Sequence, residues 1–190
     1  MQSDSRAPAR PAINHVDFML VCAGGFLATL VMTTAMYVLA LLGWGQVDLP
    51  IWIVRVFTSD PVTVGEVGVA LHLFIGLAYA WMFGYLIEPR LALAPGQAGV
   101  MFGLGLWMFA QVIGVPVLGV IAGSFHHGAP VSPGWFAAGL GFSSALSSLV
   151  AHIAYGTALS LVYGQRSAAP DGRPIRVWTQ RPATADTPAF

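Results

Sequence analysis

The chain contains four apolar stretches, each long enough to cross the hydrocarbon core of a membrane. They run over residues 17–43, 65–87, 97–123 and 135–164. A core about 30 Å thick needs about 20 helical residues. Only 8% of the chain is charged, whereas soluble domains carry about 25% charged residues. The sequence therefore predicts an all-α, polytopic membrane four-helix bundle. Because the last stretch is longer than one span requires, we expect either an interfacial lead-in over residues 135–141 or a tilted helix.

The second and fourth stretches share the motif H-x3-G-x-A-x5-G, 80 residues apart. Each copy belongs to a row of mostly small residues spaced four apart: Gly68, His72, Gly76, Ala80 and Gly84, and Ser148, His152, Gly156, Ser160 and Gly164. Such a row lies on one helical face, and small residues let helices in lipid approach closely. The first and third stretches match more weakly, with Gly25 against Gly105. We therefore predict two tandem helix-pair repeats, in which the second and fourth helices meet and bring the two histidines into one neighbourhood.

Arginine placement predicts the orientation of the four spans. All eight basic residues are arginine, and only Arg55 falls on the outer side. The others fall on one side of the membrane: Arg6, Arg10, Arg90, Arg166, Arg173, Arg176 and Arg181. The positive-inside rule then places both termini in the cytoplasm. The tails, residues 1–16 and 165–190, lack apolar periodicity, so we expect them to be disordered.

Two outer loops join the spans. Residues 49–57 are apolar but too short to span, so we expect them to lie at the membrane surface. The second outer loop carries His126 and His127, which we interpret as surface residues, with a divalent metal or proton-sensing role as the alternative. Within the third span, Pro116 predicts a kink that frees a carbonyl near Val112, to be satisfied by Gln111 or a neighbouring helix.

Composition and motifs argue against several functional classes. A net charge of zero without lysine provides no basic surface for nucleic acid. Cys22 is the single cysteine, which excludes an internal disulfide and a thiolate metal site within one chain. No intramembrane carboxylate accompanies the two histidines, so no metal site is predicted. No catalytic set of nucleophile and base is present either, and the sequence gives no positive support for an enzyme.

His72 and His152 are the candidate functional residues, because an ionisable side chain inside a span is costly. Three interpretations stay open. Each imidazole forms structural hydrogen bonds across a helix interface; or the pair are axial ligands of a b-type haem; or they line a small channel or carrier. The candidate hydrogen-bond partners are Ser144, Ser147, Ser148, Tyr79, Tyr155, Thr33, Thr34 and Gln111.

The segments AGGFLATLVMTTAM, HLFIGLAYAWMFGYL and HIAYGTALSLVYG resemble a broad group of small bacterial membrane proteins with four spans. The resemblance covers Val21 to Gln165. It implies a four-span topology in the bacterial inner membrane, and it implies no particular activity. Together with the small size of the chain, it leads to the hypothesis of a non-catalytic accessory or binding subunit. Its partners would be the lipid bilayer and the larger subunits of a respiratory or transport assembly.

Overall fold

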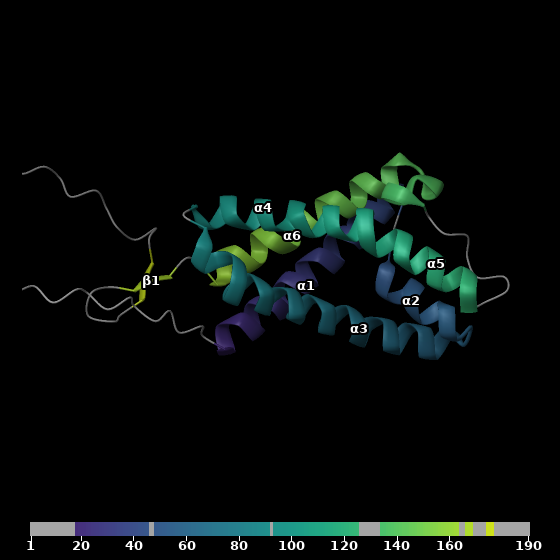
Figure 1. The fold of residues 1–190 in the computed structure, drawn as a ribbon, viewed down its shortest axis with the longest axis horizontal. Coiled ribbons are helices and arrows are strands. Elements are labelled where there is room, and N and C mark those ends of the chain that lie inside the picture. The colour runs from purple at the N-terminus through teal and green to yellow at the C-terminus, as the bar shows by residue number, and fades with distance from the viewer. Residues whose placement is uncertain are drawn as a thin grey trace, which may run out of the picture.

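The computed structural model describes residues 18–45, 48–91, 93–125, 134–163, 166–168 and 174–176. These residues are almost entirely helical (Figure 1). The longer helices are α1 (Phe18–Leu41), α3 (Pro61–Met82), α4 (Pro95–Phe109), α5 (Val115–Phe125) and α6 (Phe142–Tyr163). The shorter elements are α2 (Leu49–Phe57), the π-helical turns η1 (Phe83–Ile87) and η3 (Ala110–Gly114), the 3-10 helices η2 (Glu88–Arg90) and η4 (Trp135–Leu140), and the strands β1 (Arg166–Ala168) and β2 (Pro174–Arg176).

Four helical segments are long and apolar enough to cross a membrane: Phe18–Leu41, Pro61–Arg90, Pro95–Ile121 and Phe142–Tyr163. Their mean hydropathy lies between 1.5 and 2.0. This finding confirms the predicted helical class with four candidate spans, and it indicates a multi-pass membrane protein.

Two span boundaries differ from the predicted ones for local reasons. The second span begins at Pro61 because the Asp60 side chain caps α3 by accepting a hydrogen bond from the Thr63 amide, and proline is favoured at a first helical position. The fourth begins at Phe142, after the separate helix η4. Gly141 adopts φ 90° between the two helices, a conformation that favours glycine and ends a helix.

Helix α6 is the central helix of the bundle. It packs along α4 on one side and along α1 on the other, and α1 in turn packs against α3. Helix α2 packs against α3 and α5. Within the described helices, α3 and α4 form no extensive interface with each other, and Figure 1 shows them along opposite edges of the bundle. The resulting order is α3, α1, α6, α4.

The sequence predicts that the second and fourth helices meet, but most of the described small residues in their two rows pack against other helices. A Cβ atom added to Gly76 of α3 would lie 3.2 Å from Cβ of Thr29 on α1, whereas one added to Gly156 of α6 would lie 2.7 Å from the backbone nitrogen of Gly103 on α4. Small residues allow close approach to any complementary helix. Here α4 has its own small row, which includes Gly103, and that row receives α6.

The two helix pairs do not pack in the same register. A Cβ atom on Gly25 would lie 2.6 Å from Cβ of Ala80, so this position is a close contact between α1 and α3. The corresponding position 80 residues later, Gly105, has no neighbouring atom within 4 Å. Ser160 instead lies against Gly99, six residues before Gly105. The weak match between the first and third spans therefore carries no common packing contact.

A dense core fills the half of the bundle where α1 and α4 begin and α3 and α6 end. Its residues are Val21, Ala28, Ala80, Phe83, Ala98, Phe102, Leu106, Tyr155, Leu159 and Tyr163. The ring of Phe83 lies at the centre, with its centroid 4.9 Å from that of Phe102 and 6.3 Å from that of Tyr163. Aromatic packing of this kind closes one half of the bundle.

Pro116 is accommodated by the π-helical turn η3, which directly precedes α5. A proline lacks the amide hydrogen that a helix needs and crowds the preceding turn, and a π-turn is one way in which a helix absorbs that disruption. Gln111 lies in this turn and is fully buried. Its side chain donates to the Ser148 hydroxyl on α6 at 3.1 Å, so Gln111 joins two helices here.

The connecting segments are described only in part. Residues 49–57, expected at the membrane surface, form α2, which buries Val54 and Val56. His126 and His127 lie outside the described residues. The same holds for the tail at 1–16 and for most of 165–190, where the described part is the antiparallel pair β1 and β2.

Candidate functional site: a chamber within the bundle

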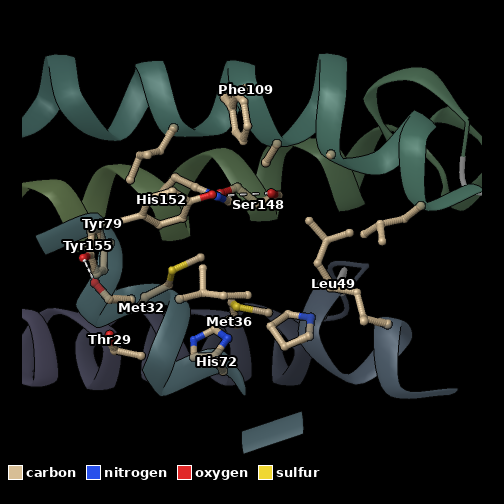
Figure 2. A pocket seen from close by; sticks show the side chains of 18 residues that line it. Thr29, Met32, Met36, Leu49, His72, Tyr79, Phe109, Ser148, His152 and Tyr155 are labelled. Carbon is tan, nitrogen blue, oxygen red and sulfur yellow. Dashed lines mark hydrogen bonds between the residues drawn. The ribbon is translucent and has the colours of Figure 1, made fainter. Parts of the chain in front are cut away.

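A chamber of about 210 Å³ lies between α1, α2, α3, α6 and the kinked third span (Figure 2). Its walls are mostly apolar, and its polar lining consists of Thr29, His72, Tyr79, Ser148, His152 and Tyr155. The two candidate histidines, from different spans, therefore line one chamber. The helices α3 and α6 are joined here by the hydrogen bond from the Tyr155 hydroxyl to the Gly76 carbonyl, and not by an extensive backbone interface.

His152 is held by its own helix. Its Nδ1 atom lies 2.7 Å from the Ser148 carbonyl oxygen, one helical turn earlier. A carbonyl oxygen only accepts, so Nδ1 carries the proton and donates it in this bond. In the neutral imidazole, Nε2 is then the acceptor, and no described group lies within hydrogen-bonding distance of it. His152 is 9% exposed.

His72 is held by α1 in the opposite tautomer. The Thr33 hydroxyl donates its single hydrogen to the Thr29 carbonyl at 2.8 Å. Its oxygen lies 3.2 Å from Nε2 of His72 and can only accept there, so Nε2 of His72 carries the proton. Nδ1 is left as the acceptor nitrogen of a neutral imidazole. Each histidine thus has one ring nitrogen bonded to a helix and one free lone pair.

The predicted partner residues contribute in different ways. Two of the candidate partners, Thr33 and Ser148, bond to the two histidines, and Gln111 donates to Ser148. The Tyr155 hydroxyl donates instead to the Gly76 carbonyl of α3 at 2.5 Å. The hydroxyl of Ser144 bonds to the Leu140 carbonyl, away from both imidazoles.

The small-residue rows position the site rather than form it. Gly76 alone among the predicted packing residues on α3 lines the chamber. Elsewhere Gly68 lies under Ile51 of α2, and Gly84 lies beside Val21 and Tyr163. On α6, Ser160 bonds to the Pro95 carbonyl at the start of α4. Gly164 is outside the described residues.

Two chamber residues on α1, Met32 and Met36, were not among the candidates. Figure 2 shows both thioether sulfurs between the imidazole of His72 and that of His152 in this view. Their spacing of four places them on one helical face, which is the signal available in the sequence. In the part of the chain that the structure describes, no three or more His, Cys, Asp or Glu side chains are grouped to hold a metal ion.

A second hollow of about 340 Å³ lies next to the chamber, between α3 and α4. It shares Tyr79, Leu106 and Phe109 with the chamber wall. These three side chains separate the chamber from a groove on the apolar surface of the bundle.

No protein-family model, curated protein or solved structure matches the chain. The class of protein is therefore defined by its own architecture. It is a helical protein with four candidate membrane spans and a small, mostly apolar chamber. The chamber is lined by two neutral histidines, each with one acceptor nitrogen free.

Proposed function

We propose that this protein is a non-catalytic binding protein of the membrane, which holds a small ligand in the chamber between its helices. The observation that carries the proposal is the pair of imidazoles in one chamber, each fixed by a helix and each with an unused lone pair. Simple structural histidines would satisfy one another or fill the space. Here a hydrogen bond through one ring nitrogen fixes the tautomer of each histidine. The other ring nitrogen forms no hydrogen bond with a described residue.

The lining defines the chemistry of the ligand. Two imidazole acceptors favour a hydrogen-bond donor or a cation, and they do not favour an anion. The mostly apolar walls favour a ligand with little bound water. The chamber volume of about 210 Å³ is below the range of about 300–1,000 Å³ typical of pockets for drug-sized molecules. These features support a small ligand more strongly than they support a haem macrocycle.

The groove between α3 and α4 offers a route from the bilayer to the chamber. Tyr79, Leu106 and Phe109 are shared by the two spaces, so rotation of these side chains would connect them. A continuous path across the membrane has less support, because the aromatic core around Phe83 fills the other half of the bundle. We therefore favour binding from one side over conduction.

The proposed cellular setting is the bacterial inner membrane, where the protein would serve as a binding subunit of a larger assembly. The described small residues of the two rows are buried within the chain, so they do not supply a docking surface for a partner helix. A partner would instead contact the lipid-facing surfaces.

Both termini are proposed to be cytoplasmic, on the basis of the arginine distribution. In a Cys22→Ala background, Ser59→Cys would lie on the outer side, between α2 and α3, and Gly96→Cys would lie on the inner side. A thiol reagent that does not cross the membrane should label Ser59→Cys in intact cells and Gly96→Cys only after permeabilisation. The reverse pattern would overturn this orientation.

The binding proposal is tested by filling the chamber. Gly114 lines the chamber, and a Cβ atom there would meet only the Phe109 carbonyl, at 4.0 Å. Gly114→Leu therefore places new carbons in the chamber. Gly96→Leu is the matched control, because Gly96 lies in the same span with no atom near its Cβ position and lines neither the chamber nor the groove.

Protein purified in nanodiscs would be analysed for bound organic molecules by mass spectrometry, for metals by elemental analysis and for haem by oxidised and reduced spectra. A species present in the wild type and in Gly96→Leu, and lost in Gly114→Leu, supports the proposal. Preparations that carry no bound species, or equal amounts in all three, contradict it. Sharp bands of a reduced haem would support the haem alternative.

A further inference from the structure

We infer that the ligand of the chamber is a single cuprous ion, held by the thioethers of Met32 and Met36 and by the free nitrogens of His72 and His152. This inference rests on the proposed binding function and names the ligand class. All four side chains line the same chamber.

The four donors come from three helices that enclose one space. Met32 and Met36 lie one turn apart on α1, and Met36 is 5% exposed. His72 comes from α3 and His152 from α6. In the view of Figure 2 both sulfurs lie between the two rings. All four side chains line the chamber, in which an ion shared by the four donors would sit.

The donor types select the ion. Thioether sulfur is a soft ligand that favours Cu(I), and imidazole also binds copper. Zinc sites use thiolate, imidazole and carboxylate ligands, and magnesium or calcium needs oxygen ligands. The chamber lining contains no carboxylate and no cysteine. The prediction of no metal site rests on the lack of further cysteines and of an intramembrane carboxylate, whereas thioether sulfur is another class of donor.

The hydrogen bonds of the two histidines match those of metal ligands. A ligating histidine usually donates its other ring N–H to a carbonyl or another acceptor, which fixes the tautomer and aims the free nitrogen. His152 does so through Nδ1 to the Ser148 carbonyl. His72 does so through Nε2 to the Thr33 hydroxyl, which is itself anchored on the Thr29 carbonyl.

The charge of the site also favours a monovalent ion. Two thioethers and two neutral imidazoles bring no negative charge, so a divalent ion would remain largely uncompensated in an apolar chamber. Asp48 caps α2 directly before the chamber residues Leu49 and Pro50, and its carboxylate interacts electrostatically with His72. One carboxylate at the chamber edge balances one positive charge.

The test is a competition for Cu(I). Full-length protein in detergent, kept reduced with ascorbate, would be titrated against the coloured Cu(I) complex of bathocuproine disulfonate. We expect one copper per chain and no displacement by Zn²⁺. Met32→Leu with Met36→Leu should weaken Cu(I) binding by more than tenfold, because leucine keeps the volume and removes both sulfurs. The double variant Met101→Leu with Met108→Leu is the control, since both residues are exposed on the same bundle.

A second variant separates positioning from folding. Thr33→Val keeps the shape and removes the acceptor for His72, and loss of such a supporting bond weakens metal sites by about 10- to 100-fold. Thr33→Ser retains the hydroxyl and should restore the affinity. X-ray absorption at the copper edge should show sulfur scatterers in the wild type and their loss in the Met32 and Met36 double variant.

The copper inference fails if no Cu(I) binds, or if binding is unchanged when both chamber methionines are leucine. If an organic molecule is then found in the wild type and lost in Gly114→Leu, the binding function stands and only the copper assignment falls. If neither copper nor an organic species depends on chamber residues, both proposals fall together.

Discussion

The hydroxyl of Tyr155 on α6 donates a hydrogen bond to the carbonyl oxygen of Gly76 on α3, at 2.5 Å. Tyr155 is 2% exposed, and both residues line the chamber. Gly76 has no side chain to shield its carbonyl, so the hydroxyl reaches it directly. This bond joins two spans whose backbones otherwise have the chamber between them, and it lies at the boundary between the chamber and the dense core.

Replacing Tyr155 with phenylalanine should therefore destabilise the bundle. Interhelical hydrogen bonds in membrane proteins contribute about 0.6 kcal/mol on average and up to about 1.7 kcal/mol. We expect Tyr155→Phe to lower the free energy of unfolding in mixed micelles by that amount. Tyr37→Phe is the control, because Tyr37 is 57% exposed; equal losses in the two variants would contradict a specific role for the bond.

The α4–α6 interface should not tolerate a methyl group at Gly103. A Cβ atom there would lie 2.8 Å from Cα of Ile153, which is backbone and cannot rotate away. We expect Gly103→Ala to cost about 1–3 kcal/mol, as overpacking does. Gly105→Ala adds the same methyl group two residues away in open space, and it should be neutral or stabilising. SDS unfolding curves of the two variants give the comparison, and similar midpoints would argue against this helix contact.

The buried amide of Gln111 depends on Ser148. Its nitrogen donates to the Ser148 hydroxyl, while Oε1 has no described partner. Ser148→Ala leaves a buried donor unsatisfied, which costs about 1–3 kcal/mol. Adding Gln111→Met removes the stranded amide and should recover part of the stability. The His152 tautomer should persist in both variants, because Nδ1 donates to the Ser148 backbone; ¹⁵N chemical shifts of the imidazole measure it.

Asp60 should make the stability of α3 depend on pH. Hydrogen bonds from the Thr63 side chain, and then from its backbone, hold the pKa of Asp60 below its ordinary value of 3.8. A depressed pKa stabilises the folded state above the unfolded pKa, and that contribution is lost as the pH falls through the folded pKa. The difference in unfolding midpoint between the wild type and Asp60→Asn should shrink as the pH is lowered from about 6 to below 3.8. A difference that does not vary with pH would contradict this role.

The number of candidate spans could be predicted from the sequence, because the apolar length that a bilayer requires is a local property of the chain. The sequence also identified Pro116 as the position of a break in the third span. The histidines were found because an ionisable side chain is rare in such segments. Their hydrogen-bond partners Thr33 and Ser148 were among the candidates for the same reason, since few polar groups are available at that depth.

Which helical faces meet could not be predicted from the sequence. Small residues make a helix able to pack closely without specifying its partner, so the row on α6 pairs with Gly99 and Gly103 of α4 rather than with α3. The chamber is the space left between α3 and α6. A repeating pattern of residues does not show where such a space will form. The proposed role of Met32 and Met36 depends on this chamber, because the sequence does not distinguish them from other apolar residues and only the fold places them in one chamber with two histidines.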